Sequence, residues 1–262
     1  MSVQKSWAEL QKMHRACTIV VETLAKLAEA AVPGVTTKEL DAIARESIVK
    51  AGAKPAFLGY RGYPATLCIS VNEEVVHGIP GKRKLKDGDV VGLDLGCIVD
   101  GYFGDSARTV GVGTVSPEAR RLMQVTEAAL QAGIAQCHPG RRVGDIGHAV
   151  QSHAEASGYS VVREFVGHGI GTSLHEEPQV PNYGPPGRRE RLVPGMCLAI
   201  EPMVNVGGPS VKVLSDGWTA VTADGSLSAH FELSVAVTPE GPWILSEPYP
   251  YAVRGQALEA HA

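Results

Sequence analysis

Several features that would place the chain in a special class are missing from its sequence. No hydrophobic run approaches the ~20 residues that a membrane-spanning helix needs, and the N-terminal stretch MSVQKSWAELQKMHRA lacks the apolar core of a signal peptide. The 5 cysteines are scattered and contain no C-x-x-C pair, which argues against a disulfide framework. We therefore expect a cytoplasmic protein with reduced thiols and no membrane partner.

The sequence also lacks an excess of charge of either sign. Lys and Arg number 24 and Asp and Glu number 28, for a formal net charge of −4, and no basic stripe stands out. Nucleic acid is therefore not expected as the main ligand. The hydrophobic fraction of 44% and the charged fraction of 20% are typical of a soluble globular protein.

Two capping boxes predict a pair of helices near the start of the chain. Ser6 with Glu9 opens a segment whose apolar residues recur at helical spacing, and this helix should end before Pro33-Gly34. Thr36 with Glu39 opens the second helix in the same way.

The region after the helices has the pattern of an antiparallel sheet. Residues 66–72 and 89–98 are rich in β-branched and alternating apolar residues, which predicts two strands. Asp100-Gly101 is a strong signal for a two-residue hairpin turn, followed by a further strand to about Val112.

The same order of elements then begins again. Pro33-Gly34 recurs as Pro139-Gly140 at an offset of 106, and Asp94 recurs as Glu201 at an offset of 107. We therefore predict an α+β protein with a single domain, residues 1–262, in which each half contains two helices and an antiparallel sheet. The halves cover roughly 6–112 and 116–240.

Acidic residues lie on these strands in otherwise apolar surroundings. If the hairpin turn has two residues, residue 105 lies opposite residue 96, so Asp105 shares a face with Asp94 at a backbone distance of ~7–8 Å. Glu201 in CLAIEPMV and Glu232 in HFELSVAV stand on strands in the same way. A buried, unpaired carboxylate costs several kcal/mol, so four acids with at most one nearby basic group indicate a metal site.

The glycine-rich segment GHGIGTSLHEEP supplies histidines. His168 stands between two glycines, which would allow the backbone to approach a metal closely. A lone histidine is more often a structural hydrogen-bonding group than a ligand, and this alternative stays open for His77 in NEEVVHGIP.

At this point the residues resemble a known family. The segments YRGYPATLCISVNEEVVHGIP, FVGHGIGTSLHEEPQVPNY, AIEPMV and AHFELSV are similar to those of the type I methionine aminopeptidases, over nearly the whole chain. The resemblance implies the pita-bread fold, in which two pseudo-symmetric halves surround a central two-metal site. It implies five metal ligands, with Asp105 and Glu232 shared by both ions: Asp94, Asp105, His168, Glu201 and Glu232.

The resemblance also implies a reaction, removal of the N-terminal methionine from nascent proteins and peptides with a small second residue. Two divalent ions ~3.5–4 Å apart can hold a bridging water as hydroxide near neutral pH. Glu201 would then accept a proton from the attacking water, His175 would stabilise the oxyanion, and His77 would contact the peptide nitrogen. Oxygen donors with one imidazole suit Mn²⁺, Fe²⁺, Co²⁺ or Zn²⁺.

For the methionine side chain, the resemblance points to a pocket with both histidines near the substrate. Phe57, Arg61 and Leu174 depart from residues common in the family at those places, so the wall should differ in shape. The implied pocket residues are His77, His175, Tyr60, Tyr63, Cys68 and Trp218.

The resemblance makes the ribosome a candidate partner besides the nascent chain, and we expect a monomer. Two other functions remain open. A proline-directed peptidase of the same fold, such as aminopeptidase P or prolidase, usually has an additional N-terminal domain, for which we expect no room. A catalytically inactive pita-bread protein that only binds peptides would have lost metal ligands, whereas all five are present.

Overall fold

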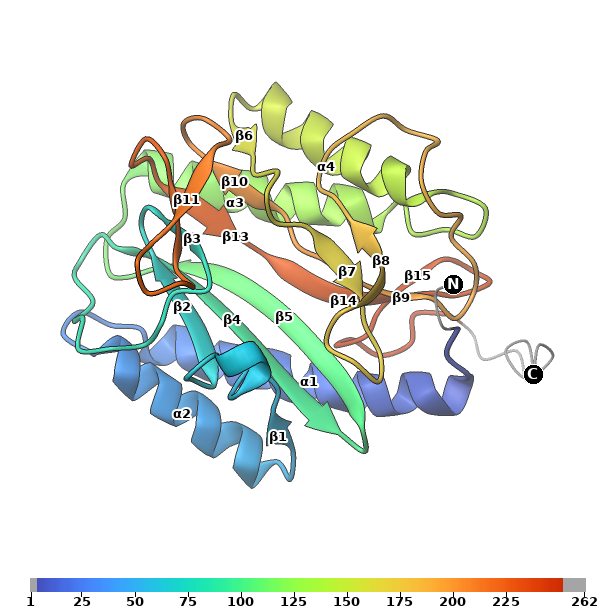
Figure 1. Cartoon of the computed structure of the whole chain (residues 1–262), viewed down its shortest axis with the longest axis horizontal. Helices are drawn as coiled ribbons and strands as arrows, with labels where there is room; N and C mark the ends of the chain where they lie inside the picture. The colour runs from blue at the N-terminus through green and yellow to red at the C-terminus, as the bar shows by residue number, and fades with distance from the viewer. Residues whose placement is uncertain (1–3, 252–262) are drawn as a thin grey trace.

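The computed structural model describes residues 4–251 and contains one broad antiparallel sheet with helices packed along one face (Figure 1). The α-helices of this part of the chain form two pairs. The first pair begins at the capping boxes, where the side chains of Glu9 and Glu39 accept the Ser6 and Thr36 amide protons at 2.7 Å. The helices are α1 (Trp7–Ala30), α2 (Thr37–Lys50), α3 (Pro117–Ile134) and α4 (Val143–Ala156).

The central sheet combines strands from both ends of the chain. Its strands are β1 (Lys54–Pro55), β2 (Leu67–Val71), β4 (Val90–Val99), β5 (Tyr102–Gly111), β7 (Gly167–Gly169), β8 (Glu176–Val180), β9 (Cys197–Ile200), β14 (Glu232–Val237) and β15 (Pro242–Ile244). Their order is β1-β4-β5-β14-β9-β7-β8, with β2 beside β4 and β15 beside β14. The pairing of β5 with β14 joins the early hairpin to the late strands.

Two smaller sheets flank the central one. They have the orders β13-β10-β6 and β11-β12-β3. The bounds of these strands are β3 (Glu74–Val76), β6 (Ser160–Val161), β10 (Met203–Asn205), β11 (Val211–Val213), β12 (Ala220–Thr222) and β13 (Ser228–His230).

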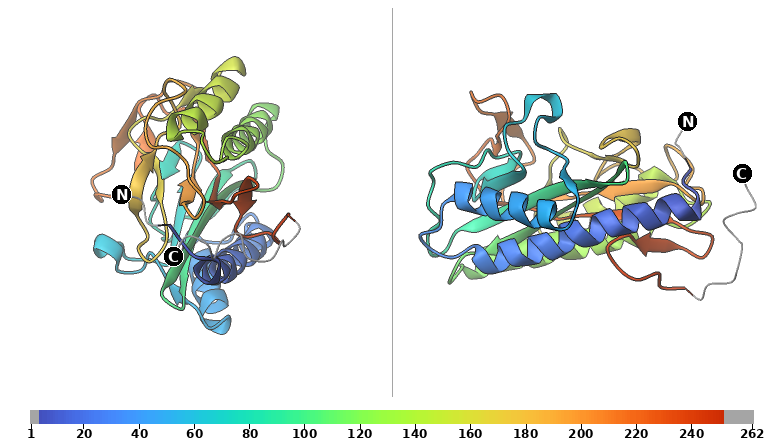
Figure 2. Two further views of the ribbon diagram at one scale, coloured as in Figure 1. Left: turned by 90° about the vertical axis from the view of Figure 1, so that its right-hand side faces the viewer. Right: turned by 90° about the horizontal axis from the view of Figure 1, so that it is seen from below.

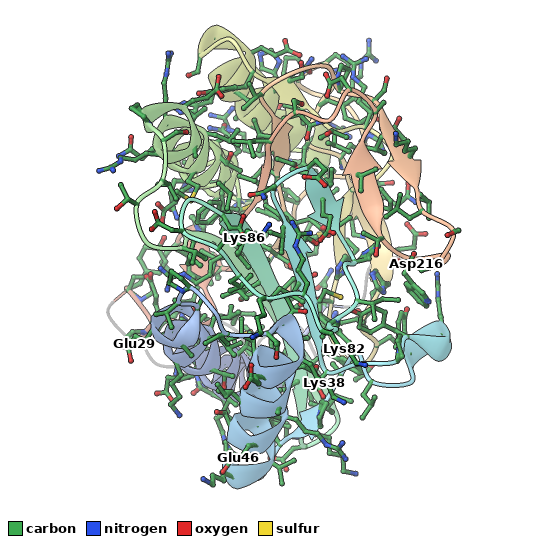
Figure 3. The ribbon with its side chains drawn as sticks, turned by 90° about the vertical axis from the view of Figure 1, so that its left-hand side faces the viewer. Glu29, Lys38, Glu46, Lys82, Lys86 and Asp216 are labelled. Carbon is green, nitrogen blue, oxygen red and sulfur yellow. The ribbon has the colours of Figure 1, made fainter. Side chains whose placement is uncertain are left out.

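The hydrophobic core lies between the helices and the central sheet. One cluster joins Leu24 of α1 and Leu40 of α2 to Leu93 of β4, and a second joins the other helix pair to β9 and β14. The two side views show the long helices gathered on one side of the sheet (Figure 2). Charged side chains such as Glu29 and Glu46 point outward from the helices (Figure 3).

The alternation of β4 then determines what the other face presents. Because Leu93 and Leu95 face the helices, Asp94 faces the opposite side of the sheet. None of the helices between residues 4 and 251 combines the length and the apolar character needed to cross a bilayer.

Candidate metal centre

Three carboxylates lie together on the helix-free face of the central sheet. The hairpin of β4 and β5 has the predicted register, with Gly96 paired to Asp105 and Asp94 paired to Ala107. Ala107 pairs on its other side with Glu232 of β14. Since paired residues share a face, and alternate residues of a strand do too, the three acids project from neighbouring strands to the same side.

Two more candidate ligands reach this face from β7 and β9. Ala199 of β9 pairs with Ser234 of β14 on one side and with His168 of β7 on the other. Glu201 follows two residues after Ala199, directly beyond the end of β9. The sheet therefore brings together side chains that are far apart in the sequence.

The glycines on both sides of His168 are required by close packing of strands. A Cβ atom on Gly167 would lie 2.3 Å from the Ala199 carbonyl oxygen, and one on Gly169 would lie 2.4 Å from the Glu177 carbonyl oxygen. A side chain at either position would push β7 away from its neighbours. The sequence predicted a close approach of this backbone to a metal, whereas the close approach that the two glycines make is to the neighbouring strands.

The acids and the imidazole are spaced like ligands that share an ion. His168 Nε2 lies 3.6 Å from Glu201 Oε1 and 3.9 Å from Asp105 Oδ2. One ligand atom each from Asp105, His168 and Glu232 lies within 4.8 Å of the other two. These separations exceed hydrogen-bond lengths but suit atoms that each contact one cation at ~2.0–2.2 Å.

Several buried oxygen atoms of the cluster lack a hydrogen-bond partner among the described residues. They are Asp94 Oδ1, Asp105 Oδ1 and Glu232 Oε1. Asp105 and Glu232 are only 4% and 2% exposed. A buried carboxylate oxygen without a donor is costly. The described residues that line the cavity supply no such donor to these oxygens, and a divalent cation is the group that the oxygens fit.

Burial raises the pKa of every acid in the cluster, and repulsion by neighbouring carboxylates adds to this for Asp94, Asp105 and Glu232. Burial raises the pKa of Asp94 to about 7 and that of Glu201 to about 8. Burial first, and then the neighbouring carboxylates, raise the pKa of Asp105 and of Glu232 well above the ordinary range. The charged forms thus require a cation in their midst.

The geometry determines which nitrogen of His168 faces the acids. Nδ1 lies 2.9 Å from the Gly169 carbonyl oxygen, which can only accept, so Nδ1 carries the proton. Burial lowers the pKa of His168 to about 3, so the ring is neutral. Its Nε2 lone pair therefore points at Asp105 and Glu201, as in a metal ligand whose tautomer is set by a backbone hydrogen bond.

A second histidine lies beside the cluster at the mouth of the cavity. The His175 ring centroid is 4.2 Å from that of His168, and its Nδ1 is 2.8 Å from the Tyr60 hydroxyl. Burial, and then the Arg61 guanidinium, lower the pKa of His175. The loop before it is held by Glu176, which pairs with buried Lys5 and accepts the Thr172 and Ser173 amide protons.

His77 stands on the other side of the cavity, in a left-handed backbone conformation with φ of 61°. Its ring packs edge-on against Phe165 and Trp218. Burial lowers the pKa of His77 to about 4, with smaller contributions from His230 and His175. A neutral imidazole in a strained backbone position is typical of functional sites.

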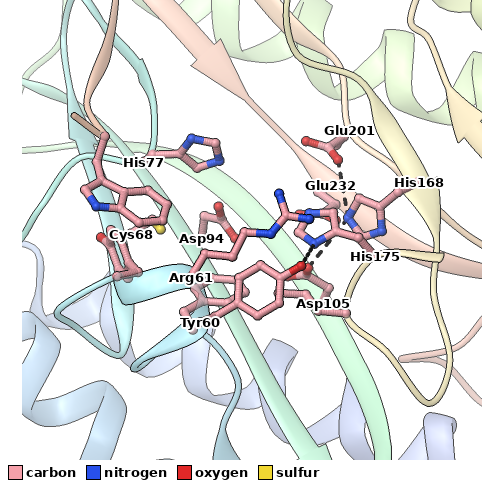
Figure 4. A pocket seen from close by; sticks show the side chains of 14 residues that line it. Tyr60, Arg61, Cys68, His77, Asp94, Asp105, His168, His175, Glu201 and Glu232 are labelled. Carbon is pink, nitrogen blue, oxygen red and sulfur yellow. Dashed lines mark hydrogen bonds and ion pairs between the residues drawn. The ribbon is translucent and has the colours of Figure 1, made fainter. Parts of the chain in front are cut away.

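All candidate residues named from the sequence line one cavity of about 170 Å³ (Figure 4). Drug-sized ligands occupy ~300–1,000 Å³, so this volume suits a single side chain. Tyr63 and Cys68 are buried at its inner end, whereas Arg61 and His175 are exposed at its mouth. The lining consists of Phe57, Tyr60, Arg61, Tyr63, Cys68, His77, Asp94, Asp105, His168, Leu174, His175, Glu201, Trp218 and Glu232.

One residue of this neighbourhood was not recognised from the sequence. His230 is 3% exposed, and its Nε2 lies 3.6 Å from Glu201 Oε2 without a hydrogen-bond partner among the described residues. Burial lowers the pKa of His230, while Asp94 acts in the opposite direction. The signal was its place two residues before Glu232, on the strand face assigned to that acid.

Comparison with known proteins relates this geometry to a family. The chain matches the model of metallopeptidase family M24 over residues 11–239. It is 53% identical to a methionine aminopeptidase of Clostridium perfringens, over 94% of this chain and 99% of that protein. The crystal structure of methionine aminopeptidase from Rickettsia prowazekii is 41% identical, with a TM-score of 0.93, and the match covers 94% of this chain and 100% of that chain.

A more distant neighbour shares the fold alone. Prolidase from Pyrococcus furiosus is 21% identical with a TM-score of 0.76, and the match covers 94% of this chain and 66% of that one. The α+β pita-bread fold expected from the resemblance is therefore confirmed.

Proposed function

The chain belongs to metallopeptidase family M24, and on this premise we propose that it is a methionine aminopeptidase of the type I class. It hydrolyses the peptide bond that follows an N-terminal methionine. The observation that carries the proposal is a single cavity in which the candidate ligands, two further histidines and an apolar wall meet. The preferred substrates are nascent proteins and peptides with a small second residue.

The metal ligands of the proposed enzyme are the donors of the helix-free face. Their unpartnered oxygens and the His168 lone pair support this assignment. Four carboxylates suit two divalent ions, because two such ions neutralise their formal charge. Oxygen donors with one imidazole favour Mn²⁺, Fe²⁺, Co²⁺ or Zn²⁺. The proposed ligands are Asp94, Asp105, His168, Glu201 and Glu232.

Bound divalent metal supplies Lewis acidity at the scissile carbonyl and lowers the pKa of water in the site. Glu201 accepts the proton of the attacking water and returns it to the leaving amine, a role that its place beside both the ligand cluster and the cavity supports. The Tyr60 hydroxyl lies 2.8 Å from Nδ1 of His175, and in the tautomer in which this hydroxyl donates, the ring proton is on Nε2 and available to the developing oxyanion. His77 contacts the peptide nitrogen from the opposite wall.

The methionine side chain lies at the inner end of the cavity. Tyr63 is fixed there because its single hydroxyl proton is shared between the Gly78 carbonyl oxygen at 2.9 Å and the Leu67 carbonyl oxygen at 3.1 Å. Its ring packs edge-on against Trp218 at 5.1 Å. Such aromatic rings select a flexible thioether by shape and by sulfur contacts. The proposed wall consists of Tyr60, Tyr63, Cys68 and Trp218, with His77 and His175 beside the scissile bond.

We further propose that residues 1–262 act as a single catalytic domain, whose outermost residues, 1–3 and 252–262, lie outside the described part. Its halves are roughly 6–112 and 116–240, and the repeated order of two helices followed by antiparallel strands supports this division. The enzyme acts as a cytoplasmic monomer on nascent chains, with the ribosome as a candidate partner.

A substrate comparison tests the proposed function. The chain, freed of metal by chelation and supplied with Mn²⁺ or Co²⁺, should release methionine from Met-Gly peptides and leave X-Pro peptides intact. Chelated protein should regain activity on metal addition. Faster turnover of X-Pro peptides would indicate a proline-directed peptidase instead, and a metal-independent lack of hydrolysis would indicate a binding protein.

A variant of the proposed proton acceptor supplies the chemical control. Glu201→Gln should lose roughly 10²-fold or more in kcat, because general acid–base catalysis contributes at least that much. Metal content is measured in parallel, so that loss of metal is not mistaken for loss of the proton acceptor. Glu22→Gln on the exposed side of α1 is the matched control. Near-normal turnover of Glu201→Gln with metal bound would contradict the assignment.

A further inference from the structure

Arg61 occupies an unusual position at the mouth of the cavity. It lies in a 3₁₀ turn (Tyr60–Gly62) with φ of 49° and ψ of 25°, a left-handed conformation that is uncommon for arginine. The guanidinium carbon lies 5.4 Å from the centroid of the Tyr60 ring. A positive group stacked on an aromatic face is held in place more firmly than a free surface side chain.

The charge of Arg61 is not neutralised by an acidic side chain of the described part of the protein. The residue is exposed, and no described carboxylate lies within ion-pairing distance of it. It is also the single arginine or lysine among the described residues that line the cavity. Figure 4 shows its side chain among the lining residues, with the guanidinium drawn near His175, whose pKa it lowers.

The four carboxylates at the base of the cavity do not attract the Arg61 guanidinium once the proposed metal ions are bound. Two divalent ions would balance the four carboxylates at the base of the cavity, so the site would have no net formal charge. Arg61 then remains as a positive charge at the mouth, partly exposed and still able to interact over ~8–10 Å at moderate ionic strength.

The path of a substrate determines what Arg61 meets. With the methionine side chain at the closed end beside Tyr63 and Cys68, the remaining peptide has to leave through the open side, where Arg61 and His175 are exposed. The second residue is small and adjacent to the scissile bond. The first side chain that can reach outward to the mouth is therefore that of the third residue.

We propose that Arg61 is a specificity-determining residue that binds a substrate carboxylate beyond the scissile bond. This inference rests on the proposed function and adds to it a preference for acidic substrates. The carboxylate can come from an aspartate or glutamate side chain at the third position or from the free C-terminus of a short peptide. A guanidinium presents paired N–H donors that match either carboxylate.

The test compares peptides that differ only in charge after the scissile bond. The metal-loaded protein is assayed on Met-Ala-Asp-Ser-amide, Met-Ala-Asn-Ser-amide and Met-Ala-Lys-Ser-amide, and the readout is the ratio of kcat/KM values. We expect the aspartate peptide to exceed the lysine peptide by roughly two- to fivefold at low salt, the range of a partly exposed ion pair. The ratio should approach one in ~0.5 M salt.

Variants at the same position show whether Arg61 causes the preference. Arg61→Gln should bring the ratio of kcat/KM for the aspartate and asparagine peptides to one. Arg61→Glu should reverse the preference, so that the lysine peptide has the highest kcat/KM. Lys38→Gln removes the same charge from the exposed start of α2, outside the cavity lining, and should leave the ratio unchanged. Because each variant is judged by a ratio, a general loss of activity does not imitate the effect.

A second pair of peptides separates the two sources of the carboxylate. Met-Ala-Asn with a free C-terminus is compared with its amide, and a preference for the free acid that Arg61→Gln removes assigns the C-terminal carboxylate. Equal rates on all peptides, or a preference that persists in Arg61→Gln, would overturn the inference alone. If no methionyl peptide is cleaved by the metal-loaded protein, the proposed function fails and the inference fails with it.

Discussion

At the scale of single residues, Glu201 stands between two neutral imidazoles rather than beside a basic group. Its Oε1 lies 3.6 Å from His168 Nε2, and its Oε2 lies 3.6 Å from His230 Nε2. The main chain is fixed independently, because the Glu201 carbonyl oxygen accepts from Asn182 Nδ2 at 3.0 Å. The side chain can therefore exchange a proton without losing its position.

His230 should contribute to metal binding although it was not among the candidate ligands. Replacement by leucine would leave the Glu201 oxygen without a polar neighbour in a buried site. We expect His230→Leu to raise the dissociation constant for Mn²⁺ by about 10-fold or more, the usual effect of losing an outer partner of a metal ligand. Isothermal titration calorimetry on the metal-free protein measures this directly.

Two further variants make the His230 result specific. His230→Gln keeps a polar side chain and should recover most of the affinity. His148→Leu replaces an exposed histidine on α4 and should bind Mn²⁺ like the original protein. An unchanged dissociation constant in His230→Leu would mean that the residue only fills space.

At the scale of elements, β5 is where helix, sheet and candidate site meet. Gly104 faces α1 so closely that a Cβ atom there would lie 2.5 Å from the Cys17 backbone nitrogen and 2.6 Å from the Ala16 carbonyl carbon. The next residue, Asp105, points to the opposite face into the metal centre. A displacement of α1 is thus transmitted to the site through a single strand.

Gly104→Ala should therefore destabilise the protein and weaken its metal binding together. The added methyl group meets helix backbone, which cannot rotate away, so we expect a loss of about 3 kcal/mol, the upper part of the range for overpacking. Urea unfolding of the metal-free protein gives the change in stability. Gly81→Ala is the control, because no atom lies within 4 Å of the place that its methyl group would take and its φ is not positive. Equal stability of the two variants would show that α1 can shift at little cost.

Local sequence predicted some elements well and missed others for a physical reason. The β4–β5 register follows from counting outward from a two-residue turn, and Asp100 and Gly101 do have positive φ of 49° and 83°. The segment HFELSVAV, in contrast, reads as one strand but is divided at Phe231. His230 pairs with Met203 in a smaller sheet, whereas Glu232 pairs with Ala107 in the central one. Pairing with strands that are distant in the sequence determines where such a strand is divided, and a local residue pattern does not indicate which strands will pair.

At the scale of the whole molecule, the candidate site depends on contacts that residue patterns alone do not contain. Alternation along β4 and β5 indicated that Asp94 and Asp105 share a face. The convergence of His168 with them requires β14 and β9 to lie between β5 and β7. Only the resemblance to a family predicted that His168 and the acids lie together. The left-handed turn that places Arg61 at the mouth has no counterpart in any periodic signal.

The buried titratable groups make the stability of the metal-free protein depend on pH in two opposite ways. The pKa values of Asp94 and Glu201 are raised to about 7 and about 8, so the folded state favours their neutral forms. Their contribution to the free energy of unfolding is complete at low pH and is lost as the pH rises through those values. The lowered pKa values of His77 and His168, about 4 and about 3, mean that their contribution is complete above the ordinary value of 6.5 and is lost as the pH falls through the lowered values. Between pH ~6.5 and ~8.5, within these groups, the carboxylates alone change charge.

Metal removal should therefore matter more as the pH rises. In the metal-free protein, ionising Asp94 and Glu201 within the buried cluster should lower Tm by roughly 5 °C from pH ~6.5 to ~8.5, since 1 kcal/mol corresponds to about 2–4 °C in a chain of this size. Metal binding requires the same carboxylates in their charged form, so added Mn²⁺ should stabilise more strongly over this interval. Calorimetry of chelated and Mn²⁺-loaded protein across the range should show the two Tm values moving apart, and Asp105→Asn should reduce the slope of the chelated form. A metal-free Tm that rises over this interval would mean that the four acids do not share one buried, unneutralised cluster.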